Sequence, residues 1–168
     1  MNADELRALQ APLKQQYRDR PESARIGAHA EAVLDPSDIA CTVPAWHGEV
    51  TAGLHKSAGG TGALACSADM LLEALVACAG VTLRAVATAY GVSIRSGRVV
   101  ADGEWDVRGT LGIDKSAPVG MTDITLRFEI DSDADDAKLQ RLIDTTERYC
   151  VIFQTLKKPP KLAVRRVG

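Results

Sequence analysis

The sequence predicts an α+β protein built around one long buried helix, with strands grouped before and after it. The helix is predicted over residues 67–91, where Ser67 favours the N-cap, Asp69 places a negative charge in the first turn and Gly91 favours a stop. Its apolar side chains fall on every side of the helical wheel, which is typical of a buried helix. Strands and helices are segregated rather than alternating, and this order indicates an α+β fold.

The first residues predict a short amphipathic helix over 2–19 that ends before Pro21. We therefore expect an N-terminal helical extension over 1–22 and one domain over 23–168. The N-terminus lacks the apolar core of a secretory signal, and four scattered cysteines do not form a secreted disulfide framework. These observations predict reduced thiols and a cytoplasmic location.

Short apolar runs over residues 24–34, 39–43 and 49–54 predict three strands of an antiparallel meander, with a turn over 44–48. The glycine-rich loop that follows reads GGTG. It lacks the GK[ST] of a phosphate-binding loop, so we do not interpret it as a nucleotide site.

Beyond the long helix, residues 92–112 predict a strand pair or one long bent strand. The clearest strand is predicted over 121–133, where apolar and polar residues alternate strictly. Residues 135–149 predict an amphipathic helix. A short helical segment after Cys150 and a final edge-like strand over 161–167 complete the prediction.

A helix that is buried on all sides needs a sheet on one side and a further element on the other. A single chain of 168 residues is short for supplying both. We therefore expect a homodimer. One side of the helix carries a row formed by Glu73, Ala77, Gly80 and Arg84. Small residues at this spacing let a second helix approach closely, and the end charges can pair with those of a partner.

Composition excludes several functional classes. The net charge of −2 gives no electrostatic basis for binding nucleic acid or an anionic membrane surface. Aromatic residues make up only 4% of the chain, so base-stacking surfaces are not expected. Glu73 and Arg84 interrupt the long helix, which argues against a membrane span.

Two thiols stand out, Cys78 in the middle of the long helix and Cys150 at the start of a short one. A helix N-terminus lowers the pKa of a thiol, so Cys150 is expected to benefit. Cys78 lies far from either end of its helix, and burial alone would raise its pKa. Reactivity at Cys78 would then need a nearby cation, most naturally an arginine; the alternative is that both cysteines only fill space.

The remaining metal and catalytic possibilities have little support. The four cysteines and three histidines form no CxxC or HxxxH pattern, so neither a metal nor another cofactor is expected. A cysteine hydrolase would pair Cys78 with His47 or His55, but no local signature accompanies either histidine.

The stretch CSADMLLEALVACAGVTLRAVA, followed later by ERYCVIFQTLK, resembles the OsmC/Ohr family. Members of that family carry one cysteine inside a long central helix and a second in a turn near the C-terminus. Cys78 and Cys150 match these two positions. The resemblance covers the chain from about residue 24 to its end, and the residues before it resemble an N-terminal addition.

The resemblance implies an OsmC-like fold, an intertwined α+β homodimer in which antiparallel sheets wrap the central helices. It also implies a thiol-dependent peroxidase that reduces organic hydroperoxides, and often hydrogen peroxide. Cys78 would become a sulfenic acid, and Cys150 would resolve it as a disulfide. A dithiol, such as a lipoyl or thioredoxin-like protein, would then reduce that disulfide, with no cofactor required.

Two positions depart from the family pattern. Family members use an arginine from the N-terminal strands, where this chain offers only Arg25, outside any recognisable motif. Asp69 stands near the position of a family acidic residue, but a first-turn charge that balances the helix dipole explains it equally well. A non-enzymatic dimer that binds an apolar ligand, or acts as a redox sensor, is therefore the alternative function.

Overall fold

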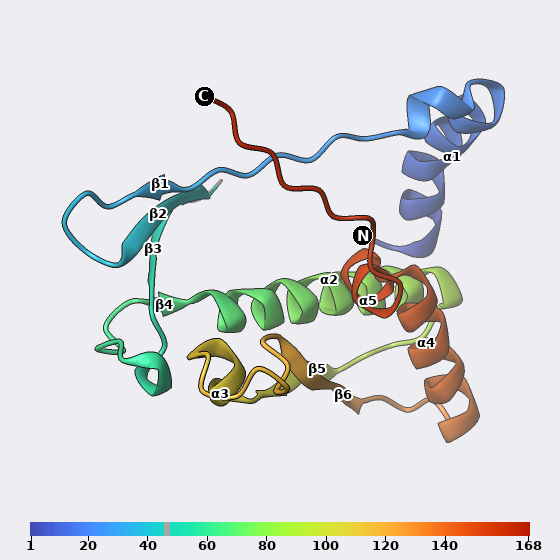
Figure 1. Cartoon of the computed structure of the whole chain (residues 1–168). Coiled ribbons are helices and arrows are strands. Elements are labelled where there is room, and N and C mark those ends of the chain that lie inside the picture. Colours follow the sequence, from blue (N-terminus) through green and yellow to red (C-terminus); the bar gives the residue numbers. More distant parts are fainter. Residues whose placement is uncertain (46–47) are drawn as a thin grey trace. The chain divides into compact units, whose positions relative to one another are not determined.

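The computed structural model describes residues 1–45 and 48–168, and these form two compact units. The first unit comprises residues 1–7, 74–100 and 127–168, and the second comprises 8–73 and 101–126. The chain opens with helix α1 (Ala3–Asp19) and the short 3-10 helix η1 (Pro21–Ala24) (Figure 1). The predicted N-terminal helix is therefore present.

The second unit contains a four-stranded sheet in the order β1-β2-β3-β4. Its strands are β1 (Val33–Leu34), β2 (Ala40–Ala45), β3 (Gly48–Gly53) and β4 (Ala65–Cys66). The first three are antiparallel, as predicted, whereas β4 runs parallel to β3 and pairs Ala65 with Ala52. The predicted turn over 44–48 includes residues 46–47, which lie outside the described part of the chain.

The predicted strand over 24–34 is wrong for most of its length, because only Val33 and Leu34 form a strand. These two residues pair with Thr42 and Cys41 of β2. Residues 25–32 find no neighbouring strand in the described chain and remain irregular and exposed. Weak alternation of small residues is not enough to hold a strand without a partner.

Helix α2 (Ser67–Tyr90) is the predicted long helix, and it begins at Ser67 itself. It ends at Gly91, whose φ of +65° is the left-handed conformation that suits a glycine stop. The prediction that every side is buried is wrong within one chain. Only one stripe is buried, formed by Leu75, Ala79, Leu83 and Ala87, and the Val81 side chain on another face is 73% exposed.

By length and composition α2 also meets the criterion for a membrane span. A core helix of a soluble protein can meet the same criterion, because it too can be long and mostly apolar. The buried stripe of α2 belongs to the core of the first unit. Leu83 and Ala87 pack there with Leu142, and the strand residues Phe128 and Ile130 close around them. This packing identifies α2 as a core helix.

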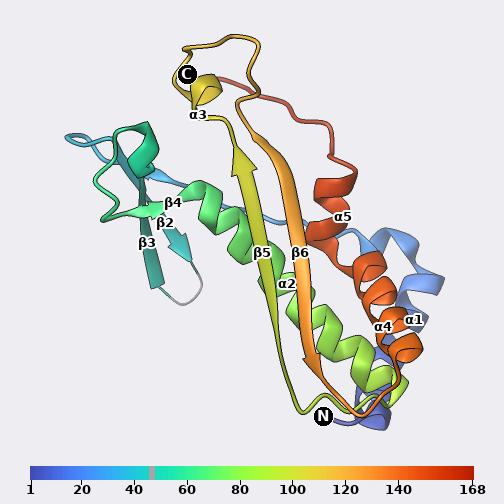
Figure 2. The same cartoon turned by 90° about the horizontal axis from the view of Figure 1, so that it is seen from below.

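Strands β5 (Ser96–Trp105) and β6 (Met121–Asp131) form a two-stranded sheet, with the short helix α3 (Val107–Thr110) between them. Figure 2 shows the two arrows side by side and pointing in opposite directions. Of the two predictions for residues 92–112, the single long strand is the correct one. The alternation predicted for β6 is also confirmed, since its apolar residues are half-buried and its polar ones exposed.

The chain then forms α4 (Asp136–Tyr149) and α5 (Val151–Lys157), both as predicted. The carboxylate of Asp135 caps α4 by accepting the backbone N–H of Lys138 at 2.8 Å. The predicted final strand over 161–167 is wrong. Residues 158–168 are irregular, and their apolar side chains are almost fully exposed, as Val164 shows at 100%.

Candidate thiol site

The first unit brings the two predicted cysteines into direct contact. Cys78 lies in the middle of α2, and Cys150 lies at the junction between α4 and α5. Both thiols are free, and they lie close enough that the Cys150 thiol, acting as a hydrogen-bond donor, lowers the pKa of Cys78. Cys150 is fully buried, whereas Cys78 is half-buried and so retains access to solvent.

The corner between α4 and α5 fixes the position of Cys150. Its backbone N–H donates to the carbonyl oxygen of Thr146 at 2.9 Å, and its own carbonyl oxygen accepts the N–H of Gln154 at 2.9 Å. The Gln154 side chain reaches back to the carbonyl oxygen of Glu147 at 2.8 Å. An ion pair of 2.6 Å between Lys157 and the Glu147 carboxylate adds a second tie across the corner.

The sulfur of Cys78 accepts several hydrogen bonds. Partial burial by itself would raise the pKa of this thiol, because it disfavours the charged form. The backbone N–H of Ile152, the Cys150 thiol and the N–H of Val151 act in the opposite direction, as does the hydroxyl of Thr82. Together they outweigh burial, and the pKa of Cys78 is lowered.

Cys150 shows the opposite shift. Burial is the main cause that raises its pKa, and proximity to Cys78 raises it further. The backbone N–H groups of Phe153 and Ile152 only partly offset these effects. The start of α5 therefore acts on Cys150 as expected, but burial and Cys78 outweigh it, and the net shift is upward; the same turn also lowers the pKa of Cys78 on another helix.

The expected cation beside Cys78 is not what lowers its pKa. Among the described residues, the groups with the largest effect on this thiol are hydrogen-bond donors, and no arginine is one of them. Arg25 follows η1 in the second unit and is exposed. Asp69 is also exposed, in the first turn of α2. Sequence reasoning missed Ile152, Val151 and Thr82. The helix start predicted after Cys150 is the signal for the first two, and the i,i+4 spacing from Cys78 is the signal for Thr82.

The sequence also offered metal ligands and two histidine bases. Across the described ranges, no three His, Cys, Asp or Glu side chains lie close enough together to hold a metal ion. His47, one of the two hydrolase candidates, lies outside the described residues. His55, the other, lies in the second unit, where its Nδ1 accepts the backbone N–H of Ser57 at 3.1 Å.

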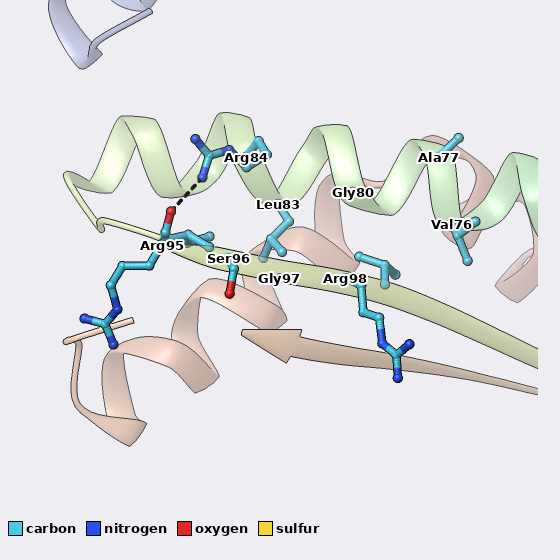
Figure 3. Close-up of a pocket in the computed structure, with 11 residues that line it drawn as sticks. Val76, Ala77, Gly80, Leu83, Arg84, Arg95, Ser96, Gly97 and Arg98 are labelled. Atoms are coloured by element: carbon cyan, nitrogen blue, oxygen red, sulfur yellow. Dashed lines mark hydrogen bonds between the residues drawn. The ribbon is translucent and has the colours of Figure 1, made fainter. Parts of the chain in front are cut away.

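A groove of about 560 Å³ runs along α2 in the first unit (Figure 3). Three members of the predicted row, Ala77, Gly80 and Arg84, line it together with residues of β5. A side chain at Gly80 would find only Val99 Cγ2 nearby, at 3.9 Å from its Cβ. Arg84 donates to the carbonyl oxygen of Ile94 at 3.3 Å, and in Figure 3 the guanidinium groups of Arg95 and Arg98 point away from α2.

Fold and site together define a helix-centred α+β protein with a pair of contacting thiols. A family model described as OsmC-like protein matches residues 60–165. The chain therefore belongs to the OsmC-like protein family. No curated protein matches the chain at a significant level.

Several solved structures share the fold. An OsmC-like protein from Mycoplasma pneumoniae is 21% identical, with a TM-score of 0.65 and coverage of 80% of this chain and 89% of that one. The organic hydroperoxide resistance protein OsmC from Legionella pneumophila is 12% identical, with a TM-score of 0.62 and coverage of 80% and 93%. An organic hydroperoxide resistance protein from Elizabethkingia anophelis is 15% identical, with a TM-score of 0.57 and coverage of 80% and 92%. At these identities the likeness establishes the fold alone.

Proposed function

We propose that this protein is a thiol-dependent peroxidase that reduces organic hydroperoxides, with Cys78 as the attacking thiol and Cys150 as the resolving thiol. The observation that carries the proposal is the contact between two thiols whose pKa values shift in opposite directions. A nucleophile needs the thiolate, which the lowered pKa of Cys78 favours. A resolving thiol only has to react later, so a raised pKa is compatible with that role.

In the first step, the Cys78 thiolate attacks one oxygen of the hydroperoxide. The S–O bond forms as the O–O bond breaks, and the leaving alkoxide takes a proton and departs as the alcohol. The sulfur of Cys78 is oxidised to a sulfenic acid by two electrons, and the peroxide is reduced by the same two electrons. The donors at the start of α5 stabilise the thiolate before the attack.

In the second step, the sulfur of Cys150 attacks the sulfenic sulfur of Cys78. The S–S bond forms, the sulfenic S–O bond breaks, and the hydroxyl leaves as water with the proton from Cys150. The interaction between the two thiols supports this step, because a disulfide needs its two cysteines to be neighbours. A dithiol, such as a lipoyl or thioredoxin-like protein, then reduces the disulfide by exchange and restores both thiols.

We also propose that the active form is a homodimer, located in the cytoplasm. Support comes from α2, whose exposed apolar residues include Leu71 and Val81, and from the groove beside Gly80. A monomer that leaves this much of its central helix uncovered gains from association with a second copy. The uncovered apolar residues and the small residues along the groove both belong to α2. We therefore expect α2 of one copy to pack against α2 of the other.

The function is tested with stoichiometric cumene hydroperoxide and reduced protein. We expect peroxide consumption to stop after one equivalent unless a dithiol is supplied, and mass spectrometry to find one Cys78–Cys150 disulfide. C78S should abolish consumption, whereas C41S, which alters a thiol outside the pair, should not change it. Full peroxide consumption by C78S would exclude the proposed mechanism.

A further inference from the structure

The second unit contains a cavity of about 390 Å³ that is lined by residues of this unit alone. It lies between the segment after β3, the start of α2, and the ends of β5 and β6 that belong to this unit. Its wall includes Leu54, His55, Leu71, Trp105, Val119 and Met121. Neither Cys78, Cys150 nor any donor to Cys78 is among the lining residues.

The chemistry of the wall defines what it can hold. No Asp, Glu, Lys or Arg is among the described residues that line it. A charged ligand would lose its hydration there and gain no counter-charge, so the wall favours an uncharged molecule. The volume lies within the range of small-molecule sites, which are mostly apolar and aromatic with a few polar groups.

Two aromatic rings form one part of the wall at a defined angle. The rings of His55 and Trp105 meet edge to face, with centroids 5.3 Å apart and planes at 77°. The His55 ring is held in turn by Ser57, whose backbone N–H and hydroxyl both contact Nδ1, at 3.1 Å and 2.6 Å. The aromatic wall is therefore fixed before any ligand arrives.

The loops around the cavity are also fixed by close backbone contacts. A Cβ at Gly60 would lie 1.8 Å from the carbonyl oxygen of Leu54, so only glycine lets these segments meet. A Cβ at Gly109 would lie 2.3 Å from the carbonyl oxygen of Pro118. Asp106 caps α3 through the N–H of Arg108 at 2.9 Å. These contacts give the cavity preformed walls, which reduces the ordering cost of binding.

We propose that this cavity is a binding site for a small, uncharged aromatic molecule. The proposal goes beyond peroxide reduction, because the residues that carry it take no part in the proposed reaction. Cys66 and Ala68 line the same cavity, and each offers a way to test occupancy.

The first test uses N-phenyl-1-naphthylamine, an uncharged fluorescent probe, and the full chain carrying W46F. Trp105 is then the only tryptophan, and we expect it to transfer energy to the bound probe. The sulfonated analogue 8-anilinonaphthalene-1-sulfonate has the same rings and a negative charge, and it should bind at least tenfold more weakly. Equal binding of the two probes would contradict an uncharged site.

Matched variants locate the probe. A68L adds a side chain to the cavity wall and should weaken probe binding at least tenfold. A74L makes the same change at an exposed position of α2 that does not line the cavity, and it should leave binding unchanged. Both substitutions keep a strong helix former, so folding is preserved. Equal effects of A68L and A74L would overturn the assignment.

A second measurement does not depend on fluorescence or on peroxidase activity. The variant C41S/C78S/C150S leaves Cys66 as the only thiol. Saturating N-phenyl-1-naphthylamine should slow alkylation of Cys66 by iodoacetamide at least fivefold. An unchanged rate, with the probe bound by fluorescence, would place the probe elsewhere and refute the proposal. Because this variant lacks both peroxidase thiols, its outcome is independent of the proposed function.

Discussion

The backbone N–H of Ile152 is the strongest of the groups that lower the pKa of Cys78, so the first turn of α5 stabilises a thiolate in the middle of α2. The Cys150 thiol, which immediately precedes α5, lowers the same pKa. One corner of the chain thus supplies both the donors that favour the Cys78 thiolate and the second thiol. This arrangement explains how a mid-helix cysteine has a lowered pKa although no arginine is among its strongest neighbours.

The pH dependence of Cys78 alkylation follows from this arrangement. Only the thiolate reacts, so the rate should rise as pH rises through the pKa of Cys78 and fall below it. Because that pKa is lowered, we expect the midpoint to lie below the midpoint of the same thiol in the unfolded protein. The measurement is iodoacetamide alkylation of C41S/C66S across the pH range. Cys150, with its raised pKa, should stay unmodified where Cys78 reacts. A Cys78 midpoint at or above that of the unfolded protein would contradict the site geometry.

Two substitutions at Cys150 separate its hydrogen bond from its redox role. C150S keeps a hydroxyl donor beside Cys78, whereas C150A removes the donor. Neither variant can form the disulfide, so both should accumulate the Cys78 sulfenic acid, detectable by dimedone labelling. We expect the pKa of Cys78 to be higher in C150A than in C150S, because only C150A loses the hydrogen bond that lowers it. Identical alkylation profiles would mean that this bond does not stabilise the thiolate.

The hydroxyl of Thr82 offers a test from within α2. T82V removes a donor to Cys78 while keeping the size of the side chain, and one hydrogen bond contributes about 1 kcal/mol. We expect the rate of reaction with cumene hydroperoxide at neutral pH to fall about fivefold. T88V is the matched control, since the Thr88 hydroxyl bonds to the carbonyl oxygen of Arg84 at 2.8 Å on the same helix. If both variants react at the wild-type rate, Thr82 has no part in stabilising the thiolate.

The sequence predicts the helices and the strictly alternating strand β6 well, because their patterns are local. The alternation of β6, the length of α2 and the amphipathic pattern of α4 all depend on neighbouring residues. The strands predicted over 24–34 and 161–167 fail because a strand also needs a partner, which the described chain does not provide for them. Local pattern alone cannot show whether that partner exists.

The candidate site was also predictable from the sequence only in part. The two cysteines follow from sequence through the family resemblance, but the direction of their pKa shifts does not. Sequence reasoning assigned the helix N-terminus to Cys150, which directly precedes it. The donors at the start of α5 also act on Cys78, and they outweigh burial there but not at Cys150, which only the packing of α5 reveals.

The groove beside Gly80 gives a test of the proposed homodimer. G80L fills the space that a second helix would use, while a Cβ at this position meets only Val99 Cγ2 at 3.9 Å within the chain. Leucine is also a better helix former than glycine by up to about 1 kcal/mol, so the fold of α2 should not suffer. We expect analytical ultracentrifugation to show at least a tenfold weaker dimer.

A89L places the same side chain at an exposed position of α2 outside the groove and should leave association unchanged. A G80L variant that associates as strongly as the wild type would show that the groove is not the interface, and a wild-type monomer would refute the homodimer itself.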